Sequence, residues 1–257
     1  MKKNILDIIK GIDELYDNPK CELVFHSNYE LLVAVILSAQ CTDKRVNAVT
    51  SELFKEFNTP EKMITLSQAE LEEKIRACGF FHNKAKHILQ ASYDIIDRFG
   101  GKIPNTKKEL KSLAGVGEKT ANVVISTAYN IPAIAVDTHV FRVSNRLGLA
   151  SSKDVRNTQK DLEKNVPKEK WTKFHHSMVL HGRYVCKAIK PRCEECELNK
   201  VCKFYKTSYR VTCFNKCRVA VHSPTFKIGF SHVHNAIPFV ARKRKFIISL
   251  FIATRVP

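Results

Sequence analysis

The chain has 257 residues, enough for one large or two small domains, and its 44% apolar content excludes an intrinsically disordered protein. Its net charge of +18 favours a polyanionic partner, either nucleic acid or an anionic membrane surface. No apolar run reaches the ~20 residues that span a bilayer. Asp7, Lys10 and Asp13 interrupt any apolar stretch of a signal peptide, so we expect a soluble protein that is not exported.

Helical patterns follow one another through residues 1–206. An amphipathic helix is predicted near the N-terminus, and the uniformly apolar stretch 31–38 predicts a central buried helix. Capping boxes begin at Ser67 and Thr106, and a further helical pattern over 83–99 ends at a pair of glycines. Because no strand alternation persists, the sequence predicts an all-α fold.

A glycine-rich turn separates two of these predicted helices, within the sequence Leu113-Ala-Gly-Val-Gly-Glu-Lys-Thr-Ala-Asn-Val-Val124. Gly115 and Gly117, on either side of Val116, let backbone N–H groups converge at a helix N-terminus, where an anion is favoured. Such a hairpin grips a DNA phosphate without reading the base sequence. The spacing fits neither a Walker loop nor a dinucleotide-binding fingerprint, and an ordinary helix–turn–helix corner is the alternative.

Lys119 lies in the first turn of the second helix of this hairpin. The positive end of the helix dipole disfavours a further positive charge there, which suits an amine used for Schiff-base chemistry. Asp137 follows a short apolar segment and opens another helix. It could be a simple N-cap, or it could lie near Lys119 and move a proton. For Lys119 the alternative is a solvated surface lysine.

Four of the nine cysteines form a tight group with the spacing Cys-x6-Cys-x2-Cys-x5-Cys: Cys186, Cys193, Cys196 and Cys202. Four soft ligands in so short a stretch can enclose one metal centre. Zinc ribbons usually pair two Cys-x2-Cys motifs, so this spacing favours a [4Fe–4S] cluster, with zinc as the alternative. The loop inside this group carries Lys187, Lys190 and Arg192, which predicts a clamp on DNA phosphates.

The last segment, 207–257, differs in composition from the rest of the chain. It contains no Asp or Glu but nine Lys and Arg. It has no clear helical period, and we expect either a disordered basic arm or a non-native extension. Its Cys213, Cys217, His232 and His234 are best explained by chance rather than as metal ligands.

Over residues 1–206, the chain resembles the endonuclease III family of iron–sulfur DNA glycosylases. The resemblance is carried by the hairpin 113–124, by Val136-Asp-Thr-His139, by His181-Gly-Arg183 and by the cysteine spacing. It implies two helical domains flanking a DNA-binding cleft. One is a helical barrel over 22–132 that contains the helix-hairpin-helix, about 106–129. The other combines 1–21 with 133–206 and holds the cluster.

The resemblance also implies roles for single residues. Lys119 would attack C1′ of a flipped nucleotide and Asp137 would assist proton transfer, while the cluster would be structural and DNA-sensing. Gln40 and Phe81 would fill the gap left by the flipped base. His139 would reach a phosphate or orient the site, although a structural histidine is the alternative. The hairpin has Ala114 where the family usually has proline, and Cys41 takes a place more often held by alanine.

The function implied is a bifunctional glycosylase and AP lyase that removes oxidised pyrimidines from duplex DNA, acting as a monomer in the bacterial cytoplasm with the nucleoid. An adenine-mismatch glycosylase of the same superfamily is the nearest alternative enzyme. Lys119 argues against it, and so does segment 207–257, whose composition does not predict the folded C-terminal domain of that branch. A non-catalytic iron–sulfur DNA-binding or sensing protein is a different class of alternative.

Overall fold

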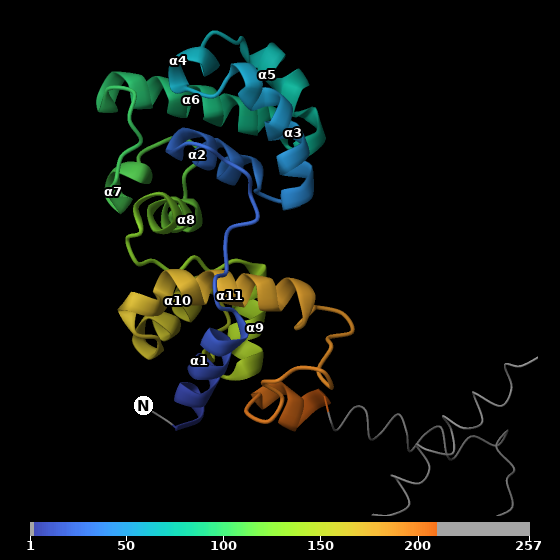
Figure 1. The fold of residues 1–257 in the computed structure, drawn as a ribbon. Coiled ribbons are helices and arrows are strands. Elements are labelled where there is room, and N and C mark those ends of the chain that lie inside the picture. The colour runs from blue at the N-terminus through green and yellow to red at the C-terminus, as the bar shows by residue number, and fades with distance from the viewer. Residues whose placement is uncertain (1–2, 210–257) are drawn as a thin grey trace, which may run out of the picture. The chain divides into compact units, whose positions relative to one another are not determined.

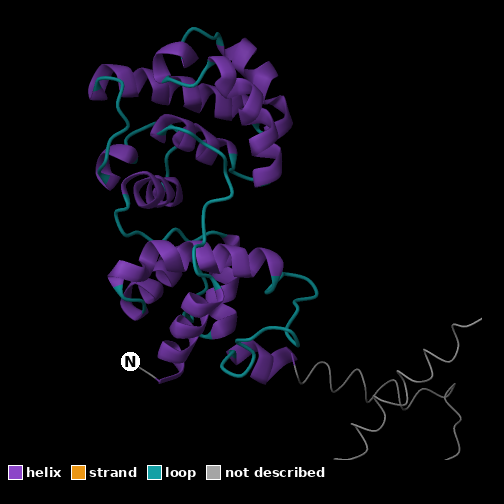
Figure 2. Ribbon diagram, in the orientation of Figure 1, coloured by secondary structure: helices purple, strands orange, loops and turns teal. Residues whose placement is uncertain are grey.

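The computed structural model describes residues 3–209. These residues form helices joined by loops, with no strand among them (Figures 1 and 2). The predicted all-α fold is therefore confirmed for this part of the chain. Residues 3–209 all belong to one compact unit. The composition-based prediction for 207–257 thus lies almost wholly outside the described residues.

The elements follow one another in a simple order along the chain. They are α1 (Lys3–Leu15), α2 (Asn28–Leu37), α3 (Asp43–Glu56), α4 (Pro60–Met63), α5 (Gln68–Ile75), the 3-10 helix η1 (Arg76–Cys78), α6 (Phe81–Phe99), α7 (Lys107–Leu110), α8 (Glu118–Tyr129), α9 (Thr138–Leu147), α10 (Val155–Asn165), the 3-10 helix η2 (Lys168–Lys170), α11 (Trp171–Tyr184) and the short π-helix η3 (Tyr205–Tyr209).

Local sequence signals account for where several helices begin and end. The capping box is present at Ser67, whose side chain accepts from the Glu70 N–H while the Glu70 carboxylate accepts from Ser67. Thr106 caps α7 by accepting from the Glu109 N–H, but its hydroxyl rather than its backbone N–H donates to the Glu109 carboxylate, and that helix lasts only four residues. Gly100 ends α6 in the left-handed conformation that glycine adopts without a steric penalty.

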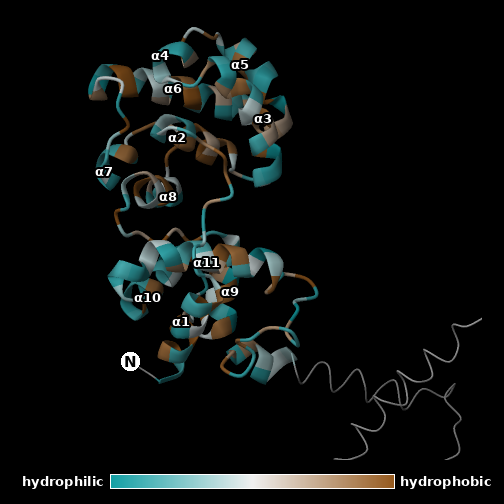
Figure 3. Cartoon of the chain, viewed as in Figure 1, coloured by the Kyte–Doolittle hydropathy of each residue, from teal (hydrophilic) through white to brown (hydrophobic). Residues whose placement is uncertain are grey.

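Helices α2–α8 surround one buried apolar core, which we call the hairpin lobe because it contains the glycine turn. Its central element is α2, in which every residue from Tyr29 to Leu37 is buried. Figure 3 shows hydrophobic residues along much of this helix. A helix that is apolar on all sides must be enclosed by others, as the sequence predicts.

A second apolar core joins the N-terminal helix to the C-terminal half of the described chain, and we call this part the cysteine lobe. Ile8, Ile9 and Ile12 of α1 pack into it together with residues of α9 and α11. The two cores thus divide the chain near the predicted boundaries, although the domain limits themselves stay a prediction.

Two features connect the lobes. Residues 133–136 run between the cores in alternation, with Ala133 and Ala135 in the hairpin core and Ile134 and Val136 in the other. The Arg183 guanidinium, at the end of α11, pairs with Glu22 and with Asp43 at 2.7 Å. Since Asp43 opens α3, this ion-pair network joins a helix of each lobe.

Candidate active site and cysteine pocket

The glycine turn between α7 and α8 depends on both of its glycines, for different reasons. Gly115 has φ +75°, and a Cβ there would lie 2.9 Å from the Cβ of His87. Backbone conformation and packing therefore both require glycine. Gly117 is the N-cap of α8 with φ −86°, and a Cβ there would meet nothing within 4 Å. The space beside Gly117 is open to a ligand.

The start of α8 carries exposed backbone donors. Gly117 supplies no side-chain cap, so the first N–H groups of the helix have no side-chain acceptor at their N-cap. Glu118 beside them forms ion pairs with Lys107 and Lys111. Lys119 is exposed and takes part in none of the ion pairs found among residues 3–209.

Asp137 is the N-cap of α9, and its Oδ1 accepts from the Val140 N–H at 2.7 Å. Its side chain is half-buried. The capping role that the sequence offered as the simpler reading is therefore present. Because the cap uses one carboxylate oxygen and fixes the group in place, it is compatible with a second role for the other oxygen.

Buried polar side chains hold the segment that leads to Asp137. The Asn122 amide, on the same helix as Lys119, donates to the Ile134 carbonyl at 3.0 Å. From the other lobe, His175 of α11 forms a hydrogen bond with the backbone of Ala135. Adjacent peptide groups are thus held from α8 on one side and from α11 on the other, which fixes where Asp137 lies relative to α8.

Buried His175 lies within electrostatic reach of both candidate catalytic residues, Lys119 and Asp137. Burial, and after it the charges of His176 and Lys119, lower the pKa of its imidazole to about 3, whereas Asp137 opposes the shift. Both charges therefore act on one buried ring. Its Nδ1 and the Asn122 Oδ1 are buried without a hydrogen-bond partner among the described residues.

Three turns of the hairpin lobe hold a non-glycine residue in the left-handed backbone region, at Gln40, Phe80 and Asn130. Gln40, after α2, has φ +53°, and Phe80, before α6, has φ +48°. The Gln40 side chain is exposed, and Phe80 is 65% exposed. Such backbone strain is concentrated at functional sites. Phe81, the residue named from the resemblance, instead packs against the hairpin core, which makes Phe80 the better placed of the two aromatic residues.

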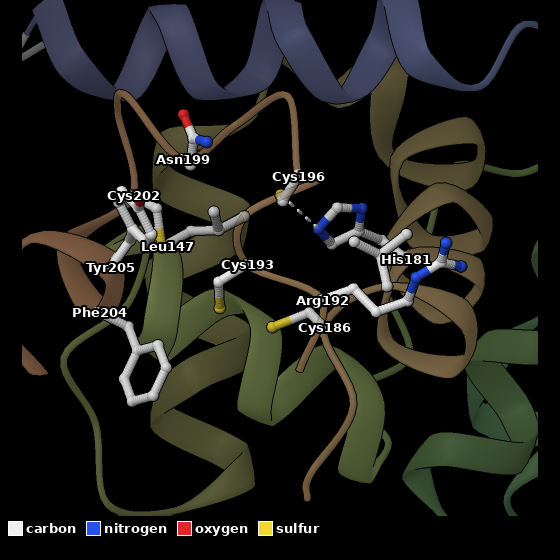
Figure 4. Close-up of a pocket in the computed structure, with 11 residues that line it drawn as sticks. Leu147, His181, Cys186, Arg192, Cys193, Cys196, Asn199, Cys202, Phe204 and Tyr205 are labelled. Atoms are coloured by element: carbon white, nitrogen blue, oxygen red, sulfur yellow. Dashed lines mark hydrogen bonds between the residues drawn. The ribbon is translucent and has the colours of Figure 1, made fainter. Parts of the chain in front are cut away.

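The four cysteines of the predicted centre line one pocket (Figure 4). Burial, followed by the charges of the other three sulfurs, raises the pKa of the Cys193 thiol to about 12. Four thiolates can share this pocket only around a multivalent cation, so the donor set fits a metal centre. No three His, Cys, Asp or Glu side chains of residues 3–209 are placed to hold a single ion.

Buried and half-buried groups surround the cysteine sulfurs. His181 Nε2 lies 3.6 Å from Cys196 Sγ, and its Nδ1 lies 3.1 Å from the Tyr16 hydroxyl. Burial lowers the pKa of His181 to about 4, so the ring is neutral and can donate one N–H to sulfur while accepting from Tyr16. Arg146 donates to Cys186 Sγ at 3.6 Å. Such contacts orient metal ligands.

The loop within the cysteine group presents its basic side chains to solvent. Lys187, Lys190 and Arg192 are all exposed, and Arg192 pairs with Glu195. Lys190 has φ +49°, so this predicted DNA contact, like Gln40, lies in the left-handed backbone region. His139, by contrast, contacts α11 at Gly182 and lies 3.1 Å from an Arg142 nitrogen. Its surroundings fit the structural alternative better than a phosphate contact.

Sequence reasoning missed Asn122, His175 and Phe80. Asn122 is three residues after Lys119 on α8, so helical spacing could have drawn attention to it. His175 precedes a second histidine in α11, and no local pattern in the sequence indicates that its ring is buried. The choice between Phe80 and Phe81 depends on where α6 begins, which sequence reasoning places least reliably.

Comparison with known proteins identifies the family. Residues 33–168 match the model of the HhH-GPD superfamily base excision DNA repair proteins. The chain is 48% identical to endonuclease III of Bacillus subtilis over 202 residues, which cover 78% of this chain and 92% of that protein.

Two solved structures are also similar to this chain. One is a trapped endonuclease III–DNA covalent intermediate, with a TM-score of 0.77 and 45% identity over 80% of this chain and 98% of that one. The other is a non-covalent endonuclease III–DNA complex, with a TM-score of 0.78 and 45% identity over 82% of this chain and all of that one. With its glycine turn, its cysteine group and this degree of identity, the chain belongs to the endonuclease III family of base-excision repair enzymes.

Proposed function

We propose that the chain is a bifunctional DNA glycosylase and AP lyase that removes oxidised pyrimidines from duplex DNA and then cuts the strand. The observation that carries this proposal is that Lys119 and Asp137 both act electrostatically on buried His175, with Lys119 in the first turn after a hairpin with exposed backbone donors. The family and the DNA complexes of its similar structures support the substrate class.

Lys119 is proposed as the nucleophile. Since it takes part in none of the ion pairs of residues 3–209, no salt bridge has to break before the amine attacks. The amine adds to C1′ of the flipped nucleotide, the base leaves with the bond's electron pair and takes up a proton, and the sugar ring opens to an imine. Abstraction of a C2′ proton then eliminates the 3′ phosphate and cuts the strand.

Asp137 is proposed to move protons in these steps. The cap to Val140 holds one oxygen at 2.7 Å, which leaves the other to take a proton from the attacking amine. Asn122 and His175 act as positioning residues, because they fix the backbone of residues 134 and 135 just before this carboxylate.

Gln40 and Phe80 are proposed as the side chains that fill the duplex where the base has left. Both are exposed and both sit in a strained turn. An apolar ring inserted between base steps partly unstacks them, and a polar amide can pair with the orphaned base. Phe80 takes the place first assigned to Phe81, because the Phe81 ring is used in the core.

The phosphate contacts are proposed at the two ends of the site. The N–H groups of Gly115 and Gly117 grip one phosphate, and Lys187, Lys190 and Arg192 grip another. Val116, the third residue predicted there, is buried and its N–H already donates to the Leu113 carbonyl, so it supports the turn instead. His139 is proposed only to support α9 against α11, where it contacts Gly182. The protein is expected to bind damaged duplex DNA as a monomer, in the nucleoid of the bacterial cytoplasm.

A [4Fe–4S] cluster is proposed in the cysteine pocket, held by Cys186, Cys193, Cys196 and Cys202. When bound, it would supply a rigid, charged crosslink rather than reaction chemistry. Arg146 stabilises the loop by donating to Cys186 Sγ and to the carbonyls of Lys187 and Ala188. The backbone that carries the basic side chains is thereby held in place.

The proposal is tested with duplexes that contain one thymine glycol or one abasic site, using wild type, Lys119→Ala and Lys111→Ala. Lys111 is the matched control because it lies in the same hairpin but pairs with Glu118. We expect wild type and Lys111→Ala to cut both duplexes and Lys119→Ala to cut neither. Equal cutting by Lys119→Ala would refute the assignment, and tight binding without cutting by wild type would support the non-catalytic alternative.

A further inference from the structure

Two thiols that the proposed chemistry does not use lie together beneath the loops of Gln40 and Phe80. Cys41 directly follows Gln40, and Cys78 ends η1 two residues before Phe80. The Cys41 side chain is close enough to the Cys78 thiol to influence it. Cys78 belongs to the hairpin core, and Cys41 packs against that core. Residues far apart in sequence therefore bring two sulfurs to one place.

A buried lysine holds the backbone around this thiol pair. Lys84 of α6 is 5% exposed, and its ammonium donates to the carbonyls of Leu37 and Cys78, each at 2.8 Å. It thus ties the end of α2, which leads to Cys41, to the end of η1, which carries Cys78. The two backbone segments that carry the thiols are therefore held together by a buried side chain.

The same lysine places a positive charge beside both sulfurs. The Lys84 ammonium interacts electrostatically with Cys41 and with Cys78. It takes part in none of the carboxylate ion pairs among residues 3–209, so its charge is not offset locally. At Cys78 this charge favours the thiolate, against the larger and opposite effect of burial on the pKa of that thiol.

The two sulfurs differ in their access to solvent. Cys78 is 1% exposed, and burial followed by the Cys41 sulfur raises the pKa of its thiol to about 11. Cys41 is only half-buried and lies beside the exposed Gln40. An oxidant in solution therefore reaches Cys41 first, and Cys78 is placed to react second.

We propose that Cys41 and Cys78 form an oxidation site whose disulfide joins the Gln40 loop to the Phe80 loop. The oxidant is a two-electron oxidant of the peroxide class. Peroxide oxidises the Cys41 thiol to sulfenic acid, and one molecule of water leaves. The Cys78 sulfur then attacks the Cys41 sulfur, its proton joins the departing hydroxide as a second water, and the S–S bond forms. A thiol reductant returns both thiols by exchange.

The consequence of this disulfide rests on the proposed function, because the linked loops carry the proposed wedge residues. Filling a flipped-out position requires both loops to adjust to the distorted duplex. A covalent bond between Cys41 and Cys78 restricts that adjustment. Oxidised protein should cut abasic DNA several-fold more slowly and should recover when a thiol reductant is added.

The disulfide is tested first without DNA, on the full chain with its metal centre. Protein is exposed to hydrogen peroxide, free thiols are blocked with N-ethylmaleimide, and tryptic peptides are weighed. We expect peptide 21–44 to be linked to peptide 77–84. Peptide 21–44 also contains Cys21, so Cys21→Ala is the matched control that should keep the link, whereas Cys41→Ala should lose it. Absence of this link, or its persistence in Cys41→Ala, overturns the proposal.

The effect on DNA is tested on the same samples. Peroxide can also damage an iron–sulfur centre, but it would do so equally in wild type and in Cys41→Ala. We expect only wild type to lose cutting that dithiothreitol restores, and Cys41→Ala to be insensitive. An identical response of the two proteins overturns the proposed restraint on the loops. Failure of the proposed function is distinguishable, since reduced wild type would then not cut DNA at all.

Discussion

Alanine substitution at the two glycines of the turn should separate folding from DNA binding. At Gly115, alanine must adopt φ +75° and place its Cβ 2.9 Å from the Cβ of His87. The left-handed conformation and the overpacking together cost roughly 2 to 4 kcal/mol. For a chain of this size the melting temperature should fall by roughly 5 to 15 °C. Thermal unfolding followed by circular dichroism measures this.

Gly117→Ala is the matched comparison. Its φ of −86° suits any residue, and the added Cβ meets nothing within 4 Å, so the melting temperature should change little. The methyl group would instead occupy the space proposed for a phosphate. Loss of one charge-assisted hydrogen bond to phosphate costs roughly 1.5–3 kcal/mol, so Kd for a duplex with an abasic-site analogue should rise roughly ten- to hundredfold. Equal melting temperatures for the two variants, or unchanged Kd for Gly117→Ala, would refute this reasoning.

Three further outcomes are expected. Phe80→Ala should slow cutting of lesion DNA at unchanged stability, whereas Phe81→Ala should lower the melting temperature because that ring packs on the core; the reverse pattern would return the wedge to Phe81. Burial lowers the pKa of His175 in the folded protein to about 3, below the usual ~6.5. The unfolded state therefore takes up a proton first as pH falls, and the free energy of unfolding decreases from pH 6.5 towards pH 3. Wild type should lose about 2 kcal/mol of unfolding free energy between pH 7 and 5 through this group, and His175→Asn should show a correspondingly flatter denaturation profile; parallel profiles would contradict the burial of the ring. Cys202→Ser should lose a broad visible absorption near ~400 nm that Cys21→Ser retains, and a colourless wild type would favour zinc.

Helix positions could be predicted from sequence wherever a local signal governs them. Ser67 and Thr106 cap helices as their spacing indicates, and the apolar stretch 31–38 is a buried helix. The glycine turn was recognisable because Gly115 needs a conformation that few other residues adopt. The cysteine pocket follows from spacing alone, since all four cysteines come from one short stretch.

Contacts between distant segments could not be predicted in this way. The hydrogen bonds of Asn122 to residue 134 and of Lys84 to Leu37 depend on how helices pack, which no local spacing records. The same holds for Cys41 and Cys78, two scattered cysteines that only the fold brings together. Phe80 and Phe81 are neighbours with the same side chain, and only the start of α6 decides which ring is exposed.

The central claim is that the Lys119 amine bonds covalently to DNA, and borohydride trapping on an abasic duplex tests it most directly. Reduction of the imine fixes the complex, and digestion should then place the adduct in peptide 112–142, in which the modified Lys119 resists trypsin. We expect the Lys119 adduct in wild type and, in the longer peptide 109–142 that lacks the Lys111 cleavage site, in Lys111→Ala, and none in Lys119→Ala. An adduct on another lysine, or undiminished trapping by Lys119→Ala, would contradict the account.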